Sequence, residues 1–249
     1  MIKDNLSKVY QRISSVCSKI NIRPDSVTIV AVSKGRSVEE IKETVESGVT
    51  DIGENRIQEA LLKYKALSTI DHRPSTIRWH MVGHLQTNKV KDAVKIFDLI
   101  HSVDSARLAA EMDKQALKIN KVQDILIEIK TSPEATKSGI KPDEAIEVIK
   151  EIDKFKNINI KGLMTIAPLA DDPQKARPYF RMLRELMDKI NALHVTRNTL
   201  HVLSMGMTDD FEIAIEEGST MIRLGRAIFG DQTTVASQGL SCDKIRPKC

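Results

Sequence analysis

The segment Val27-Thr-Ile-Val-Ala-Val-Ser-Lys34 decides the fold class of this 249-residue chain. Its first six residues form a nearly continuous β-branched run, which is typical of a strand buried on both faces of a parallel sheet. A capping box follows, because Glu40 stands three residues after the hydroxyl group of Ser37. The helix that begins there is expected to end near Gly48, since glycine readily adopts a left-handed conformation. The segment therefore predicts a strand followed by a helix.

The same strand–helix unit recurs until the chain has eight of them. Seven further strands are expected at residues 50–52, 77–82, 99–103, 125–129, 160–165, 200–203 and 220–224. Helical sequence follows them at residues 55–67, 88–96, 106–119, 142–155, 174–192, 209–217 and 226–229. Pro142 is expected at the first position of its helix, and Thr208 is expected to cap the helix that Gly218 ends. An amphipathic helix over residues 1–20 precedes the first unit.

Eight such units in roughly 250 residues predict an α/β fold, a (β/α)8 TIM barrel with an extra N-terminal helix. The rival is an open doubly wound sheet, but its G-x-G-x-x-G fingerprint does not follow the first strand. No linker rich in Pro, Gly and Ser divides the chain. We therefore expect one domain over residues 1–230 and a polar tail over residues 231–249.

Composition and charge exclude several classes of protein. The net charge is only +4, and the nine aromatic side chains are too few for a base-stacking surface, so we expect no nucleic-acid partner. No apolar run approaches the ~20 residues that span a bilayer, and residues 1–19 do not resemble a signal peptide. The odd number of cysteines, Cys17, Cys242 and Cys249, indicates reduced thiols. We expect a cytoplasmic protein without a membrane partner.

Two basic residues stand at strand ends, where barrel proteins place their active sites. Lys34 shares a strand face with Val30 and Val32, which points its amine into the mouth of the barrel. The alternative is a lysine that only extends its amine to water. Arg223 shares a face with Met221 inside an apolar strand, where a charge needs a partner. That partner is either a structural ion pair or a ligand.

Two glycine turns, Ser204-Met-Gly-Met207 and Leu224-Gly-Arg-Ala-Ile-Phe-Gly230, follow the last two strands. Barrel enzymes often hold a phosphate group on backbone N–H groups at these two strand ends. A lysine, an inward arginine and a phosphate cradle together suggest a phosphorylated aldehyde held as a Schiff base. Pyridoxal phosphate (PLP) is such an aldehyde.

At these residues the sequence resembles the pyridoxal phosphate homeostasis protein family, whose members are barrels related to the barrel half of alanine racemase. The resemblance covers most of the chain and is specific in combination. The matching segments are Val30-Ala-Val-Ser-Lys34, Ile52-Gly-Glu-Asn55 with Gln58-Glu59, Trp79-His80-Met-Val-Gly83 with Leu85-Gln86-Thr-Asn-Lys89, Lys137-Ser-Gly139, Gly162-Leu-Met164, Ser204-Met-Gly-Met207, Gly218-Ser-Thr220 with Arg223, and Gly225 with Ala227-Ile-Phe-Gly230.

The resemblance implies a single-domain PLP barrel of fold type III, in which Lys34 carries the cofactor. It places Arg223 at the pyridine nitrogen and leaves the cofactor open to water, because no second β-domain covers the barrel. The remaining cofactor contacts implied are Asn55 and Met164 at the ring, and Ser204, Gly206, Gly225 and Arg226 at the phosphate.

Three positions depart from the family pattern. Arg226 stands where a small hydroxyl residue is usual, and either pairs with phosphate or points away from it. His84 replaces a usual proline. Glu128 and Lys130 stand where neutral amides are usual, and share one strand face. They either pair with each other, or Lys130 alters the electrostatics of the cofactor.

The function implied is a carrier that buffers PLP inside the cell and hands it to PLP-dependent apoenzymes, as a monomer. An arginine at the ring nitrogen keeps that nitrogen unprotonated, which disfavours carbanion chemistry. An amino-acid racemase of low activity is the alternative, and a phosphosugar barrel without PLP is a third. His80 and His84 lack a third ligand for a metal site. His80 either orients the cofactor or is a core histidine.

Overall fold

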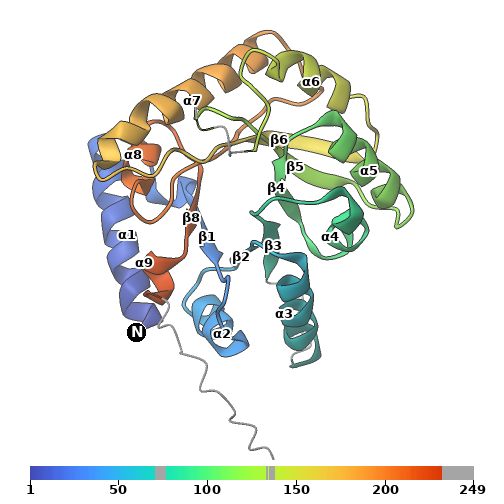
Figure 1. Ribbon diagram of the computed structural model, residues 1–249. Helices are drawn as coiled ribbons and strands as arrows, with labels where there is room; N and C mark the ends of the chain where they lie inside the picture. The colour runs from blue at the N-terminus through green and yellow to red at the C-terminus, as the bar shows by residue number, and fades with distance from the viewer. Residues whose placement is uncertain (71–76, 133, 135–137, 232–249) are drawn as a thin grey trace, which may run out of the picture.

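In this computed structural model of the chain, the described residues are 1–70, 77–132, 134 and 138–231. They form a closed barrel of eight parallel strands, in which β8 also pairs with β1, so the expected (β/α)8 barrel is confirmed (Figure 1). The strands are β1 (Thr28–Val32), β2 (Asp51–Glu54), β3 (Arg78–Met81), β4 (Leu99–Val103), β5 (Gln123–Glu128), β6 (Ile158–Met164), β7 (Val202–Ser204) and β8 (Met221–Leu224).

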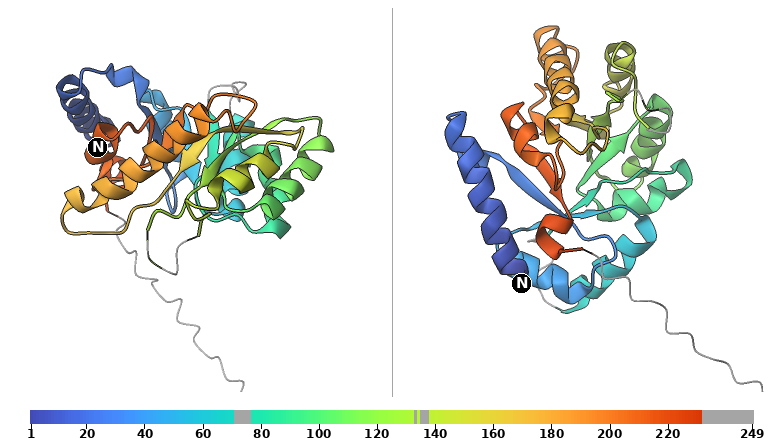
Figure 2. Two further views of the ribbon diagram at one scale, coloured as in Figure 1. Left: turned by 90° about the horizontal axis from the view of Figure 1, so that it is seen from above. Right: turned by 60° about the vertical axis from the view of Figure 1, so that its left-hand side comes forward.

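Helices surround the barrel, and an additional helix precedes β1. They are α1 (Ile2–Lys19), α2 (Val38–Glu46), α3 (Ile57–Ile70), α4 (Val90–Ile96), α5 (Ala106–Leu117), α6 (Ala145–Ile152), α7 (Arg177–Ala192), α8 (Phe211–Glu216) and α9 (Arg226–Phe229). Helix α1 packs against α8 and α9, so the two ends of the described chain lie side by side (Figures 1 and 2). Among these helices, none combines the length and the apolarity that crossing a membrane requires.

Local signals set several helix ends correctly and two helix starts wrongly. Ser37 and Glu40 form the expected capping box. Pro142 does not begin a helix, because the N–H of Glu144 closes a turn on the carbonyl of Lys141 and α6 begins only at Ala145. The cap predicted from Thr208 is also wrong. Its hydroxyl accepts a hydrogen bond from the Ala227 N–H, and α8 begins after Asp210.

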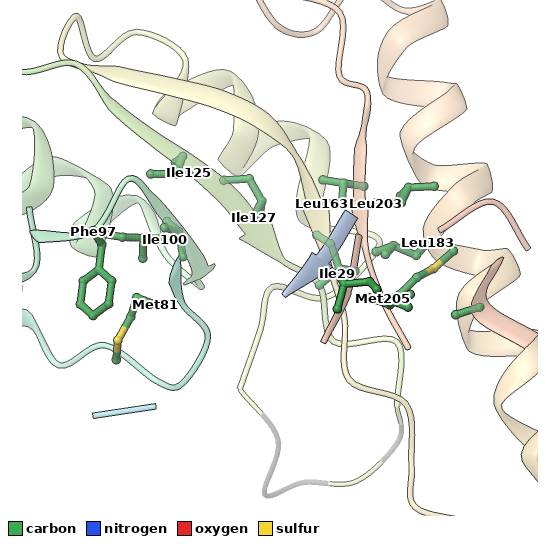
Figure 3. Close-up of a cluster of buried hydrophobic side chains, with 14 of the residues drawn as sticks. Ile29, Met81, Phe97, Ile100, Ile125, Ile127, Leu163, Leu183, Leu203 and Met205 are labelled. Carbon is green, nitrogen blue, oxygen red and sulfur yellow. The ribbon is translucent and has the colours of Figure 1, made fainter. Parts of the chain in front are cut away.

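Alternate residues of each strand divide the apolar core into two layers. The outward layer packs under the helices, and Figure 3 shows part of it, including Ile125, Ile127 and Leu203, with Leu183 of α7. The inward layer fills the barrel with a second cluster of buried side chains: Val30, Val82, Leu99, Leu126, Met164 and Met221. Since Lys34 has the same parity as Val30, it continues the inward row of β1 toward the mouth.

Gly162 on β6 lets the backbones of β6 and β7 come close together. A Cβ atom at this position would lie 1.9 Å from the carbonyl oxygen of Val202. We expect Gly162→Ala to destabilise the protein by about 3 kcal/mol, because rigid backbone must move to relieve the overlap. Denaturant unfolding measures this. The control is Gly225→Ala, whose Cβ would lie 3.6 Å from its first neighbour, and equal unfolding midpoints for the two variants would contradict the prediction.

Candidate functional site

Several of the predicted side chains lie at the carboxyl ends of the strands, which form the mouth of the barrel. Lys34 lies two residues past β1 and is exposed, whereas half-buried Asn55 follows β2 directly. Arg223 and Met164 are buried near the ends of β8 and β6. A cavity of about 260 Å³, which we call the mouth cavity, opens next to Asn55, and its lining also includes Gly83, His84, Glu128, Lys130 and Ser132.

An ionic cluster of Glu54, Lys63 and the partly exposed Glu59 lies next to the loop that carries Lys34. The Nζ atom of Lys63 donates hydrogen bonds to Glu54 Oε1 at 2.7 Å and to Glu59 Oε1 at 2.6 Å. It also donates to the carbonyl oxygen of Ser33 at 2.6 Å. Glu54 is fully buried and the Lys63 side chain is 8% exposed, so water screens these contacts weakly.

The two carboxylates of this cluster hold the residues on both sides of Lys34. The Ser33 hydroxyl donates to Glu54 Oε1 at 2.5 Å, and the N–H of Gly35 donates to Glu59 Oε1 at 2.6 Å. Backbone and side-chain groups before and after Lys34 are therefore tied to β2 and α3. The exposed amine stands on a loop whose path is fixed.

The pKa values of this cluster reflect burial and pairing. Burial raises the pKa of Glu54, although the hydrogen bonds from Lys63 and Ser33 lower it in part. Burial also acts to raise the pKa of Glu59, but hydrogen bonds from Lys63 and Gly35 outweigh it and the pKa is lowered. One oxygen of Glu54, Oε2, is buried and has no hydrogen-bond partner among the described residues. The cluster thus depends on the charge of Lys63.

Arg223 lies inside the barrel with three of its five N–H groups engaged. Its NH1 group donates to the carbonyl oxygen and the hydroxyl oxygen of Ser204, at 2.8 and 2.7 Å, and its NH2 group donates to the carbonyl oxygen of Thr165 at 2.8 Å. Burial lowers the pKa of Arg223 to about 10, while Asp210 and Glu128 act to raise it. The guanidinium group therefore stays charged near neutral pH.

A continuous chain of polar side chains leads away from Arg223 through the barrel; we call it the interior chain. Beyond Ser204, His101 Nδ1 lies 3.0 Å from the Ser204 hydroxyl oxygen, and His101 Nε2 lies 2.9 Å from His80 Nδ1. His80 Nε2 lies 2.9 Å from Asp51 Oδ1. His80 is thus a core histidine rather than a residue of the mouth, and the Ser204 hydroxyl faces the interior.

The two glycine turns lie against each other. Arg226, after β8, pairs with Asp209, after β7, and both side chains are more than half exposed. The N–H of Ala227 donates to the hydroxyl of Thr208 at 3.3 Å. The structure therefore brings the predicted phosphate turns together, and the guanidinium group of Arg226 is engaged by Asp209.

Glycine is required at one of these turns for a steric reason. Gly206 has a φ of 92°, and a Cβ atom there would lie 2.5 Å from the Cβ of Ala214 and 2.9 Å from the Cα of Phe211. The turn after β7 therefore lies directly on α8. Gly225 precedes α9, where a Cβ atom would find room.

Glu128 is the carboxyl group of the mouth cavity. It ends β5, is 7% exposed and lines the cavity together with Lys130. Burial raises its pKa to about 7, with a further increase from Asp104 and a decrease from Arg223. Because β1 and β5 are on opposite sides of an eight-stranded barrel, Glu128 and Lys34 belong to opposite sides of the mouth.

Sequence reasoning missed the partners that support the predicted residues. Lys63 carried a readable signal, since it stands four residues after Glu59 on a helix. The sequence around His101 and Asp51 gave little indication of their role, because their hydrogen-bond partners come from other strands. Lys137, Cys242 and Cys249 lie outside the described residues, and Cys17 is buried with a free thiol.

Comparison with known proteins first defines the class. Residues 5–233 match the family described as alanine racemase, N-terminal domain. A solved alanine racemase of Clostridium difficile 630 is 17% identical with a TM-score of 0.69, over 93% of this chain and 58% of its own chain. The protein is a barrel of the class found in alanine racemase.

More similar proteins define the family. A pyridoxal phosphate homeostasis protein of Aquifex aeolicus (strain VF5) is 42% identical over 229 residues, which are 92% of this chain and 97% of the relative. PipY of Synechococcus elongatus PCC7942, solved with PLP bound, is 32% identical with a TM-score of 0.80, over 92% of this chain and all of that chain. The chain belongs to the pyridoxal phosphate homeostasis protein family.

Proposed function

We propose that this protein binds PLP reversibly as a Schiff base on Lys34 and acts as an intracellular carrier of the cofactor. The observation that carries the proposal is the convergence at one barrel mouth of an exposed amine on a fixed loop, a buried guanidinium group and two adjoining glycine turns. PLP bound to the related PipY supports the choice of ligand.

The residues present fit this cofactor. Arg223 has two N–H groups beyond its described hydrogen bonds, on Nε and on NH2, and these suit a ring nitrogen that accepts a hydrogen bond. Gly206 and Gly225 place the backbone of two turns at the strand ends that suit a phosphate. Asn55 and Met164 lie at the ends of β2 and β6, where they would contact the ring.

Two of the side chains that the resemblance implies as phosphate contacts, Ser204 and Arg226, have other hydrogen-bond partners in the structure. The Ser204 hydroxyl is engaged by Arg223 and His101, so we assign the phosphate to the backbone of the Gly206 turn rather than to that hydroxyl. Arg226 would have to leave Asp209 to reach a phosphate. Its contribution to binding stays a prediction.

A carrier role follows from the chemistry of Arg223. Bound PLP supplies an aldehyde for an amine and a ring that withdraws electrons best when its nitrogen is protonated. A charged guanidinium group only donates hydrogen bonds, so it keeps that nitrogen unprotonated. The site holds the aldehyde without promoting further bond cleavage.

An absorbance spectrum of the purified protein with added PLP tests the proposal. We expect a Schiff-base band that borohydride removes, and mass spectrometry of the reduced protein should place the added mass on Lys34. A protein that stays colourless would contradict the proposal and favour the phosphosugar barrel.

Glu128 favours a second candidate function, an amino-acid racemase of low activity. Racemisation needs one proton acceptor on each face of the substrate, and Lys34 and Glu128 belong to opposite sides of the mouth. With its pKa raised to about 7 by burial, Glu128 would accept a proton from a substrate Cα atom near neutral pH. The Lys34 amine, released when the substrate amine replaces it on the aldehyde, would return a proton to the other face.

We expect Glu128→Gln to lower the exchange of the α-hydrogen of alanine for deuterium by about 100-fold, the effect of losing one general base. NMR measures the exchange, with Glu147→Gln, on the exposed face of α6, as the control. Exchange that is absent in the wild type would remove this second function and leave the carrier role.

The carrier role implies recipients and a place of action. We propose that PLP-dependent apoenzymes of the cytoplasm accept the cofactor from a monomeric protein whose domain spans residues 1–230. Mixing the loaded protein with an apoenzyme, and comparing its activation rate with that by free PLP, tests this extension. A rate equal to that of dissociation alone would contradict direct transfer.

A further inference from the structure

The interior chain has a direction that its two ends determine. The guanidinium group of Arg223 can only donate hydrogen bonds, and the carboxylate of Asp51 can only accept them. His80 must therefore donate from Nε2 to Asp51, which leaves its Nδ1 to accept the Nε2 proton of His101. His101 Nδ1 then accepts the hydroxyl proton of Ser204, whose oxygen accepts from Arg223. In this arrangement every proton between NH1 of Arg223 and the carboxylate of Asp51 has one acceptor.

A doubly protonated His80 would reverse the hydrogen bonds of His101 and leave the buried hydroxyl proton of Ser204 without an acceptor. If His80 carried both ring protons, His101 would donate from Nδ1 to the Ser204 oxygen. That oxygen would accept from both His101 and Arg223, its only two side-chain contacts in the part of the chain described here, and its own proton would face neither. Burial, together with His80 and Arg223, also holds the pKa of His101 well below its usual range, so His101 is neutral.

We propose that Asp51, His80, His101 and Ser204 act as one relay that positions Arg223 for the ring nitrogen of the cofactor. The ligand in this statement rests on the function proposed above, whereas the direction of the relay does not. These four are positioning residues, because they act on the ligand only through Arg223.

The relay works by fixing the plane of the guanidinium group. It turns the Ser204 hydroxyl proton toward His101, so that the lone pairs of the oxygen face NH1 of Arg223. NH1 is then committed to the two oxygens of Ser204, and one N–H of NH2 is committed to Thr165. The remaining N–H groups of Arg223, on Nε and on NH2, therefore have fixed directions.

Asp51, which fixes the direction of the relay, lies at the end of the barrel opposite the mouth. Asp51 begins β2, and its side chain is 14% exposed at the end opposite the mouth. Two further groups face it there, the guanidinium group of Arg78 at 3.8 Å and the hydroxyl of Thr50 at 3.5 Å. A carboxylate near water thus orients a cation near the ligand through buried neutral groups.

Nitrogen NMR of ¹⁵N-histidine-labelled protein without cofactor tests the direction. We expect His80 and His101 each to carry a single proton on Nε2. Substitution of His72, His84, His194 and His201 by glutamine, one at a time, assigns the signals that do not belong to His80 or His101. The exposed His84, His194 and His201 also serve as matched controls. A proton on Nδ1 of either buried histidine, or a doubly protonated His80, overturns the proposal.

Two substitutions at Asp51 test transmission to Arg223. The amide of Asp51→Asn can donate as well as accept, so we expect mixed histidine tautomers and a shifted Nε–H resonance of Arg223. Asp51→Glu retains a carboxylate, which only accepts hydrogen bonds, and should therefore keep the wild-type histidine tautomers. The Arg223 shift should vanish when Ser204→Ala breaks the chain. A shift that persists there, or no shift at all, overturns the relay.

The loaded protein then tests the ring contact. We expect Asp51→Asn to weaken PLP binding about 5-fold, within the range of couplings between distant sites. Unchanged affinity would overturn the positioning role. A wild-type protein that binds no PLP would instead refute the proposed function, while the histidine and arginine resonances would still decide whether the relay exists.

Discussion

Lys34→Ala should abolish the Schiff-base band and the borohydride-stable adduct completely. Without the amine, only non-covalent contacts from Arg223 and the two glycine turns hold the cofactor. We expect PLP affinity to fall by about 100-fold, which corresponds to ~2.7 kcal/mol. Absorbance titration measures the affinity, and mass spectrometry after reduction measures the adduct. Stability should change little, because the Lys34 side chain is exposed.

The control for this variant is Lys91→Ala, which removes an exposed lysine from α4 and should leave the band unchanged. Lys130 is a second lysine to test, because its side chain lines the mouth cavity. A band that survives Lys34→Ala but disappears in Lys34→Ala/Lys130→Ala would move the attachment to Lys130. A band that survives both would refute a mouth amine as the carrier.

Lys63→Met should destabilise the protein by ~3–5 kcal/mol, the usual effect of removing one partner from a buried ion pair. Methionine fills a similar volume but leaves the fully buried carboxylate of Glu54 beside Glu59, with no cation between them. The carbonyl of Ser33 also loses its donor. Denaturant unfolding measures the loss, and hydrogen exchange at the Gly35 N–H should report loosening of the Lys34 loop.

The loss of stability in Lys63→Met should depend on pH. Without Lys63 only the hydrogen bond from Ser33 still offsets the burial of Glu54, so the pKa of Glu54 in the folded variant rises further above the ordinary value of 4.5. Folded Glu54 then keeps its proton while unfolded Glu54 releases it, so the free energy of unfolding falls as the pH rises above that value. The deficit relative to wild type should be smallest near pH 4.5 and larger at neutral pH.

Two further variants separate charge from packing. Glu54→Gln added to Lys63→Met removes the uncompensated charge and should recover a large part of the stability. Lys150→Met is the matched control, because Lys150 pairs with Glu147 at 2.8 Å on an exposed helix face and should contribute less than about 0.5 kcal/mol. Equal losses from Lys63→Met and Lys150→Met would contradict a structural role for the buried cluster.

The sequence predicted the fold wherever the signal was local. The apolar run of β1, the capping box of Ser37 and Glu40, and the glycine after α8 each act within a few residues, and each prediction was confirmed. Pro142 and Thr208 failed because hydrogen bonds outside the helical pattern decided those starts. A proline or a hydroxyl residue is compatible with a turn as well as with a helix start.

The site was predictable only in part because its supports come from several strands. Alternation placed Lys34 and Arg223 on inward faces without any knowledge of neighbours. The interior chain joins side chains from five strands, and only the register of the closed barrel shows that His80 faces Asp51 and His101. The contact of Lys63 with the Ser33 carbonyl likewise depends on how α3 packs against β2, the strand that pairs with β1.

The pairing of β1 with β8, and the packing of α1 on α9, have a consequence for how this chain is synthesised. The side chain of Asn5 donates a hydrogen bond to the carbonyl of Ile228, a residue 223 positions later. Nearly the entire polypeptide must therefore leave the ribosome before β1 can pair with β8. Until then one edge of β1 has no partner strand. Nascent chains that stall before β8 should be targets for chaperones and proteases.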